Sequence, residues 1–482
     1  MSEDRADALA RLRDGRFDVV VVGGGITGCG VALDAAARGL SVALVERRDL
    51  ASGTSSKSSK LVHGGLRYLQ QGDVQLVREA LKERQRLREN APHLVRVLPF
   101  LIPIFSSDGV VNPKLAGAFK QVLRGYDLAG GRRIGKTYEQ ISADDAVERV
   151  RMLRRDRTVG AFVYYDAQTD DARLTLAVAR TAIDHGATVL TWAPVVDLLK
   201  DDAGRAVGVR VQPVDATEPI DVRATVVVNA TGVWSDELRT LDEGADPDSI
   251  RPAKGIHITV PWAKVGNDIA CVFPVPGDKR SIFVVPTADK VHTYIGTTDT
   301  DYDGPLDDPQ CTPEDVRYVL DAMNASLEEP LTEADVTGTW AGLRPLVKSA
   351  SSARTADLSR GHKVERSTSG IVSIAGGKLT TYRHMAADTV DEVMKAAGKR
   401  GKSSTDKLRL HGADGYDAAL AVDARLADRY GGDAQAVLAL VADDPSLGDP
   451  LVDGQPYLRA EAVFAVRHEL ARTLDDVLTR RI

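Results

Sequence analysis

The amino-acid sequence predicts an α/β protein with a parallel sheet, a largely antiparallel second part and a small helical C-terminal part. Three observations predict this class. A β-branched run at 17–22 leads at once into a glycine-rich turn and an alanine-rich stretch, which is typical of a strand–turn–helix unit in a parallel sheet. Strand patterns dominate 250–347. The residues beyond 401 are alanine-rich with helical spacing.

The elements are expected from apolar spacing and from turn residues. After the first strand, a helix over 29–38 ends at Gly39, and 41–46 alternates into a second strand. A Ser/Thr-rich loop at 52–59 follows, and a polar linker over 395–406 precedes the C-terminal helices. The other predicted elements are helices over 75–90, 174–185, 313–326 and 379–397 and strands over 188–192, 206–212, 222–228, 255–260, 281–285, 292–296 and 370–375.

Composition narrows the function classes. The chain has 482 residues, 43% hydrophobic and 27% charged, enough for roughly two to four folded domains. A net charge of −7 argues against a nucleic-acid partner. Three widely spaced cysteines offer neither a disulfide framework nor metal-ligand spacing, so no metal site is expected. Residues 1–15 do not resemble a signal peptide, and no apolar stretch approaches the ~18 residues of a membrane-spanning helix, so we expect a cytoplasmic location.

The glycine-rich turn predicts a dinucleotide site. Gly23, Gly25 and Gly28 form the pattern G-x-G-x-x-G between a strand and a helix. The first glycine allows the tight turn, the second a close approach to a pyrophosphate, and the third the packing of helix on strand. Glu46 ends the second strand, where it can accept hydrogen bonds from a ribose, which favours FAD or NAD over NADP. An ordinary glycine turn is the alternative.

Two later segments favour a flavin. A strand over 226–228 runs into Asn229-Ala230-Thr231-Gly232, whose small residues allow close approach of a ligand. Gly376-Gly377-Lys378 opens a helix whose N-terminus can stabilise an anionic reduced flavin. A plain strand end and a plain helix start remain the alternatives. Together these features predict a Rossmann-like FAD-binding domain.

Several strings closely resemble signatures of the FAD-dependent glycerol-3-phosphate dehydrogenases, within the D-amino-acid-oxidase-like superfamily. The most specific are Ser-Ser-Lys-Ser-Ser-Lys-Leu-Val-His-Gly-Gly-Leu-Arg-Tyr-Leu at 55–69 and Gly-Gly-Lys-Leu-Thr-Thr-Tyr-Arg at 376–383. Further matches lie at 254–257, 296–299 and 342–345, in the family's order. The resemblance implies oxidation of sn-glycerol 3-phosphate to dihydroxyacetone phosphate by hydride transfer to flavin N5, with electrons passed to membrane quinone.

The resemblance also implies a domain plan and a set of FAD contacts. The plan has a discontinuous FAD-binding domain over 16–91, 150–245 and 366–400, a substrate-binding domain over 92–149 and 246–365, and a helical C-terminal domain over 401–482. The terminal helices are expected to be shorter than in similar proteins, and a homodimer is allowed. Non-covalent FAD contacts are expected from Gly23, Gly25, Ile26, Thr27, Gly28, Glu46, Arg47, Thr54, Ser55, Ser59, Lys60, Leu61, His63, Gly64, Gly65, Val195, Ala230, Gly232, Trp234, Gly377, Lys378, Leu379 and Thr380.

The implied substrate carries a phosphate, so its site needs a cationic clamp, a base and a donor for a developing oxyanion. The family motifs map substrate binding onto Arg67, Tyr68, Arg360 and Lys378, and catalysis onto His257 and Arg344. Lys378 at a helix N-terminus opposes the helix dipole, which favours a functional interpretation. His257 suits the base, whereas Arg344 could instead lower the pKa of the hydroxyl, and the division stays open. Without the resemblance, each residue has an ordinary structural interpretation.

A basic segment over 92–137 is a candidate for contact with an anionic membrane surface. It holds seven basic and two acidic side chains in a chain of net charge −7. Leu115, Phe119, Val122, Leu123 and Tyr126 recur at helical spacing, so an interfacial helix is one interpretation. A core-facing helix with a solvated basic side is the other. The interfacial interpretation would place the protein peripherally on the cytoplasmic membrane, beside its quinone.

Two rival functions remain at this stage. A glycerol-3-phosphate oxidase that uses O₂ could share every substrate motif, and release of hydrogen peroxide would reveal it. A flavin-fold binding protein without turnover is the rival from another class. Bleaching of the flavin by substrate would exclude it.

Overall fold

The computed structural model describes residues 5–70, 73–278, 280–348 and 361–482, without the side chains of residues 67 and 70. Its first sheet has a parallel centre made of β1 (Arg16–Val22), β2 (Val42–Val45), β7 (Thr188–Leu190), β10 (Ile220–Asn229) and β18 (Val372–Gly376). Three strands add antiparallel edges: β8 (Val195–Lys200), β9 (Ala206–Val211) and β17 (His362–Arg366). This confirms the predicted parallel sheet.

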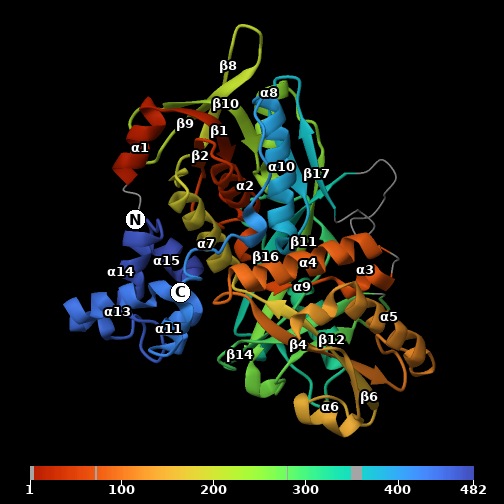
Figure 1. Ribbon diagram of the computed structural model, residues 1–482. Coiled ribbons are helices and arrows are strands. Elements are labelled where there is room, and N and C mark those ends of the chain that lie inside the picture. Colours follow the sequence, from red (N-terminus) through yellow and green to blue (C-terminus); the bar gives the residue numbers. More distant parts are fainter. Residues whose placement is uncertain (1–4, 71–72, 279, 349–360) are drawn as a thin grey trace.

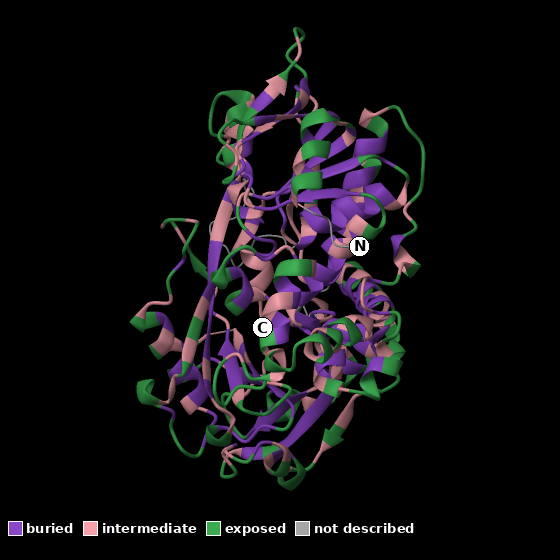
Figure 2. Ribbon diagram, turned by 90° about the vertical axis from the view of Figure 1, so that its left-hand side faces the viewer, coloured by how far each residue is buried: buried purple, intermediate pink, exposed green. Residues whose placement is uncertain are grey.

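Both faces of the first sheet are buried. Val19 and Val21 of β1 pack among α2 (Ile26–Ala37), α7 (Asp171–Asp184) and α10 (Tyr382–Ala396), whereas the alternate residues Val20 and Val22 face a second apolar cluster that includes α1 (Arg5–Asp14). Successive side chains of a strand point to opposite faces, so a strand covered on both sides is apolar throughout. This explains the unbroken valine run of β1. Figure 2 shows the buried strands of both sheets beneath exposed helix surfaces and turns.

The second sheet is antiparallel except where β12 runs parallel to β4. This confirms the predicted antiparallel second part. Its strands are β3 (Leu61–Val62), β4 (Arg96–Phe105), β5 (Glu139–Ile141), β6 (Thr158–Gln168), β11 (Ile250–Pro261), β12 (Ala270–Pro274), β13 (Ser281–Pro286), β14 (His292–Gly296), β15 (Thr300–Asp301) and β16 (Gly338–Val347). Helices beside the sheets are α3 (Leu66–Gln70), α4 (Val74–Asn90), α5 (Ala116–Ala129), α6 (Ala143–Arg149), α8 (Ser235–Glu243) and α9 (Pro313–Asn324).

The domain boundaries stay a prediction, with one revision. β3 and β6 belong to the second sheet, although the sequence analysis assigned 61–62 and 158–168 to the flavin-binding part. The physical reason is pairing: β6 runs beside β4 along its whole length, and two apolar strands of matching length bury each other.

The interfacial interpretation of the 115–126 stripe is wrong for most of its residues. Phe119, Leu123 and Tyr126 are buried against the second sheet, and Val122 is half-buried. Only Leu115 of the stripe is exposed, at 61%. The stripe therefore serves the core, and what remains outside is the basic side of α5. Within the described residues, no helix is both long and apolar enough to cross a membrane.

The C-terminal helices form a separate cluster next to α7, at the lower left of Figure 1. They are α11 (Tyr416–Leu420), α12 (Ala424–Tyr430), α13 (Ala434–Asp443), α14 (Arg459–His468) and α15 (Leu474–Arg480). Arg481 is fully buried and donates to both carboxylate oxygens of Asp49, at 2.7 and 2.8 Å. Arg480 donates to the same carboxylate at 2.6 Å. The loop after β2 is thereby joined to the far end of the C-terminal cluster.

Candidate active site

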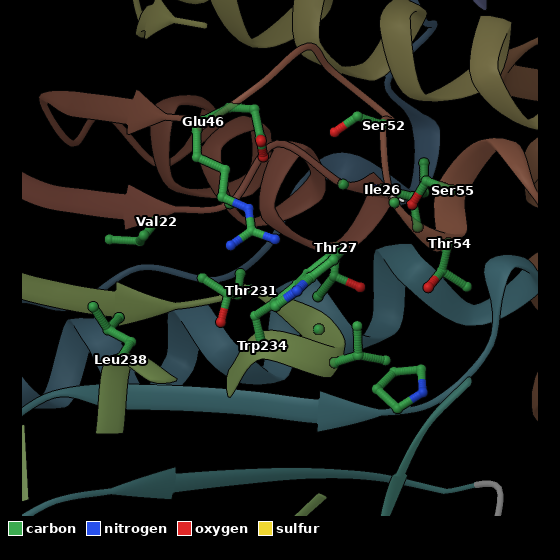
Figure 3. Close-up of a pocket in the computed structure, with 18 of the residues that line it drawn as sticks. Val22, Ile26, Thr27, Glu46, Ser52, Thr54, Ser55, Thr231, Trp234 and Leu238 are labelled. Atoms are coloured by element: carbon green, nitrogen blue, oxygen red, sulfur yellow. Dashed lines mark hydrogen bonds between the residues drawn. The ribbon is translucent and has the colours of Figure 1, made fainter. Parts of the chain in front are cut away.

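A cavity of about 300 Å³ opens where β1, β2 and β10 end. In Figure 3, Thr27, Glu46 and Trp234 line it from three different elements. The carboxyl ends of parallel strands are where open α/β sheets bind ligands. The location of this cavity is therefore the one that the glycine-rich turn predicts.

The turn after β1 is built as a cradle. Gly23 has φ +110°, and a Cβ there would lie 2.6 Å from the Ala230 carbonyl oxygen. A Cβ on Gly28 would lie 1.9 Å from the Gly23 oxygen, so only glycine lets α2 start this close. Gly25 is the N-cap of α2, and a Cβ added there would meet only Ser55 Oγ, at 3.2 Å. Its open side leaves the helix N-terminus accessible to a phosphate.

The strand ends add polar groups to this cavity. Glu46 accepts hydrogen bonds from the N–H groups of Gly24 and Arg48, at 2.6 and 2.8 Å, and burial raises the pKa of its carboxyl. Each carboxylate oxygen can accept a second bond, so Glu46 keeps capacity for a ribose. Trp234 carries the Arg47 guanidinium 4.3 Å above its ring, and its Nε1 is buried without a hydrogen-bond partner among the described residues. These groups and the glycine cradle fit a bound dinucleotide.

A second cavity of about 220 Å³ lies between the two sheets. It shares with the first cavity the residues Thr54, Pro345, Gly377, Lys378 and Leu379. A ligand lying along the first cavity would therefore meet a small molecule in the second at the Gly377–Leu379 turn. The second cavity is where the second sheet presents His257 and Arg344.

His257 is held by a hydroxyl group and by an aromatic ring. Its Nε2 lies 2.9 Å from Ser59 Oγ, and its ring is parallel to that of Trp340. Burial, Arg344 and Lys60 lower the pKa of His257 to about 3. The imidazole is thus neutral near pH 7, and its role as a base stays a prediction. Ser59, predicted as a flavin contact, also lines this cavity and contacts the histidine.

Cationic side chains converge on the same cavity. Arg344 donates to Asp299 at 3.2 Å, to Thr297 Oγ1 at 3.0 Å and to the Thr298 carbonyl at 3.1 Å. These bonds hold the guanidinium in one orientation. Lys378 is the N-cap of the 3₁₀ turn Leu379–Thr381, and its Nζ lies 3.7 Å from the centroid of the Tyr68 ring. Such a cation–π contact helps to hold the ammonium group in place.

The structure places most of the predicted site residues on one of the two cavities. Predicted residues lining the first are Gly23, Gly25, Ile26, Thr27, Glu46, Arg47, Thr54, Ser55, Val195, Ala230, Gly232, Trp234, Gly377, Lys378 and Leu379. Those lining the second are Thr54, Ser59, Leu61, His63, Tyr68, His257, Arg344, Gly377, Lys378, Leu379 and Thr380.

Several predicted residues lie elsewhere. Gly28, Gly64 and Gly65 line neither cavity and act through backbone packing. Lys60 also lines neither, because its ammonium pairs with the buried Asp171 at 2.5 Å. Arg67 lies in α3, with its side chain outside the described part, and Arg360 lies outside the described residues.

Two functional candidates escaped the sequence analysis. Trp340 supports His257 from the neighbouring strand β16, in direct register with it. Lys57 lines the second cavity, and burial lowers the pKa of its ammonium group. Trp340 carries no local signal, whereas Lys57 stands within the specific 55–69 string.

Comparisons with known proteins agree with this geometry. The chain matches a family described as FAD dependent oxidoreductase over residues 18–383 and one described as C-terminal domain of alpha-glycerophosphate oxidase over 401–482. Glycerol-3-phosphate dehydrogenase 2 of Mycobacterium tuberculosis is 44% identical, over 99% of this chain and 83% of that protein. The FAD-complexed glycerol-3-phosphate dehydrogenase of Bacillus halodurans has a TM-score of 0.78 and 33% identity, over 99% of this chain and 88% of that chain. The chain therefore belongs to the FAD-dependent glycerol-3-phosphate dehydrogenase family, and its cofactor is FAD.

Proposed function

We propose that the protein oxidises sn-glycerol 3-phosphate to dihydroxyacetone phosphate, by hydride transfer to flavin N5, and passes the electrons to membrane quinone. One observation carries the proposal: the two cavities meet at the Gly377–Leu379 turn, with His257 and Arg344 on the smaller one. FAD bound in the larger cavity supplies the electron acceptor for the substrate carbon. The names of the relatives support the choice of substrate.

Lys378 binds the substrate phosphate in this scheme. Its side chain is directed to the smaller cavity by Tyr68, and a charge-assisted bond to an anion there is about twice as strong as a neutral one. Arg67 and Arg360 join it as family-assigned partners. The clamp selects the phosphate ester over glycerol.

His257 and Arg344 act at the substrate hydroxyl. Ser59 Oγ lies at His257 Nε2 and also lines the cavity, so a hydroxyl reaches this nitrogen either directly or through Ser59. The neutral imidazole accepts the hydroxyl proton as the substrate carbon loses its hydride. Arg344 stabilises the negative charge that develops on the oxygen, because its guanidinium is already oriented. The two roles are complementary: His257 takes the proton, and Arg344 stabilises the charge that remains on the oxygen.

We also propose that the protein lies peripherally on the cytoplasmic membrane, where quinone is available. The basic face, which we define as Lys114, Lys120, Arg124, Arg132, Arg133 and Lys136, is exposed on α5 and its flanking turns. Leu115 and Leu128 stand beside it, 61% and 72% exposed. Basic side chains around exposed leucines suit an anionic lipid surface.

One experiment tests substrate, flavin and acceptor together. Glycerol 3-phosphate is added anaerobically to the purified yellow protein, followed by a soluble quinone analogue, with glycerol as the control. We expect bleaching of the flavin by glycerol 3-phosphate alone and recovery of the oxidised spectrum with quinone. Absence of bleaching overturns the function, in favour of a binding protein. Fast reoxidation by O₂ with stoichiometric hydrogen peroxide, faster than by quinone, would instead identify an oxidase. Acid precipitation should release the flavin, because its binding is non-covalent.

A further inference from the structure

The segment from His63 to Tyr68 determines where two cavity side chains stand. His63 and Tyr68 line the smaller cavity, whereas Gly64 and Gly65 between them do not. The Tyr68 ring supports Lys378, so a shift of this segment would move both the ring and the ammonium group. Side chains that hold these two glycines can therefore influence the substrate site without lining its cavity.

The backbone N–H of Gly64 is held by a buried pair of side chains. It donates to Asp166 Oδ1 and to the Tyr126 hydroxyl oxygen, each at 3.1 Å. The Tyr126 hydroxyl in turn donates to both oxygens of Asp166, at 2.8 and 2.7 Å. Both side chains are 1% exposed. A Cβ on Gly64 would lie 2.4 Å from the Tyr126 hydroxyl oxygen, so the backbone sits directly against it.

Arg84 completes this Gly64 anchor, which we define as Tyr126, Asp166 and Arg84. Its guanidinium donates to Asp166 Oδ1 at 2.5 Å and to the carbonyl oxygens of Tyr165 and Gly131, at 3.0 and 2.9 Å. Arg84 is fully buried, so loss of either member of this charge pair would leave the other buried and unpaired. The three side chains come from α5, β6 and α4, so the anchor ties Gly64 to three elements at once.

The hydroxyl of Tyr126 stays a donor under all ordinary conditions. Burial, reinforced by the charge of Asp166, raises the pKa of Tyr126 well above its usual value. Neither Tyr126 nor Asp166 lines either of the two cavities described above, so neither touches a ligand bound in them. Their effect on a ligand must pass through Gly64.

We propose that Tyr126 and Asp166 are positioning residues for substrate binding, which act through Gly64 on Tyr68 and Lys378. The inference rests on the proposed function, since it concerns the phosphate clamp of that site. Removal of the Tyr126 hydroxyl takes away one of two acceptors from Gly64 and one donor from Asp166. The segment then relaxes, and Tyr68 and Lys378 lose alignment, while the glycine turn and the strand ends that line the flavin cavity stay in place.

The test compares Tyr126→Phe with Tyr164→Phe in the full-length, FAD-loaded protein. Tyr164 is the matched control: it lies in the same core cluster, edge-on to Tyr126 at 5.9 Å, and its hydroxyl makes no hydrogen bond in the described part of the chain. FAD content, KM and kcat for glycerol 3-phosphate, and the inhibition constant of inorganic phosphate are measured for both. We expect Tyr126→Phe to raise KM and the phosphate constant roughly 3- to 10-fold, with kcat changed less than about twofold. Tyr164→Phe should leave both constants unchanged.

Each other outcome decides against the inference. An unchanged KM in Tyr126→Phe overturns it. An equal rise of KM in Tyr164→Phe also overturns it, because removal of any tyrosine hydroxyl from this core would then weaken substrate binding equally. Loss of FAD from Tyr126→Phe overturns it too, because the anchor would then serve the whole fold. If wild-type protein itself shows no bleaching with glycerol 3-phosphate, the proposed function has failed before the variants are compared.

Discussion

Trp340 lies parallel to His257, with ring centroids 4.7 Å apart and planes inclined by 10°. The two residues are register partners on β16 and β11, so the sheet itself brings the rings together. Stacking on the indole keeps water from one face of the imidazole and leaves it little rotational freedom. Trp340 thus adds to the burial that, with Arg344 and Lys60, keeps His257 neutral, and it also orients the imidazole ring.

Replacing Trp340 by leucine should expose His257 to protonation. In the wild type the pKa of His257 is about 3, so the imidazole is neutral above about pH 4 and flavin reduction should show no acid limb from this group. Opening the site raises the pKa of His257 toward 6.5, so the imidazole becomes protonated in mild acid. The rate of flavin reduction in the variant should therefore fall as the pH falls from 7 to 5. The measurement is anaerobic stopped-flow reduction by saturating glycerol 3-phosphate. An acid limb near pH 6.5 in the wild type would contradict this account, and His257→Gln should slow reduction about 10²- to 10⁴-fold at every pH.

His93 should make the fold sensitive to acid. It is 2% exposed, and burial, followed by Arg173 and His411, lowers its pKa to about 3. Below pH 6.5 the unfolded chain binds a proton at this histidine that the folded chain does not bind. The free energy of unfolding therefore decreases as the pH is lowered, by about 1.4 kcal/mol per pH unit for this group. The Tm of His93→Gln should therefore decrease less than the Tm of the wild type between pH 7.5 and pH 5. His185→Gln, at an exposed histidine, is the control and should follow the wild type.

Gly28→Ala should abolish FAD binding. The added Cβ would lie 1.9 Å from the Gly23 carbonyl oxygen, so the turn and α2 must separate. Gly117→Ala is the control, because the Cβ there meets nothing within 4 Å and alanine favours a helix by up to about 1 kcal/mol. Flavin absorbance per protein after gel filtration is the readout. A yellow Gly28→Ala protein with normal flavin content would show that the turn does not hold FAD.

Lys378→Met should weaken binding of glycerol 3-phosphate without removing FAD. Loss of a charge-assisted bond to a buried anion costs about 1.5–3 kcal/mol, roughly ten- to a hundredfold in KM. Lys363→Met is the control, since Lys363 lies on the nearby edge strand β17, paired with Glu365 and largely exposed. Steady-state kinetics with a dye acceptor measures both. Equal KM values in Lys378→Met and wild type would remove Lys378 from the clamp.

The double variant Leu115→Ser, Leu128→Ser should reduce flotation with anionic vesicles while dye-coupled activity survives. Both leucines are exposed beside the basic face, so serine costs little stability. Each basic side chain near an anionic surface contributes about 1 kcal/mol, which salt screens. Phe119→Ser, at a buried residue, should lower Tm instead. Wild type that fails to float, or a double variant that floats equally well, would exclude this surface as the membrane contact.

The glycine turn could be predicted from the sequence because its requirements are local. Gly23 and Gly28 contact each other within one turn, so spacing along the chain carries the geometry. The basic segment shows the limit of such reasoning. Helical periodicity predicted a helix around Phe119, but it could not distinguish a stripe facing a sheet from one facing lipid.

Long-range contacts account for what sequence reasoning missed. Trp340 meets His257 only because β11 and β16 pair in one register, and nothing near either residue specifies that register. Asp166 did carry a signal: a carboxylate near the end of the apolar strand β6 requires a buried partner. The identity of the partners, Tyr126 and Arg84, followed only from the packing of α5 and α4 on the second sheet.

The Arg481–Asp49 pair joins two parts of the chain that are synthesised far apart in time. Asp49 follows β2 directly, in the loop that runs beside the flavin cavity, and its partner is 432 residues further along the chain. A growing chain that has completed β1, α2 and β2 therefore contains Asp49 before its partners Arg480 and Arg481 have been synthesised. The loop beside the flavin cavity therefore takes up these arginine contacts only once residues 480 and 481 have docked on Asp49.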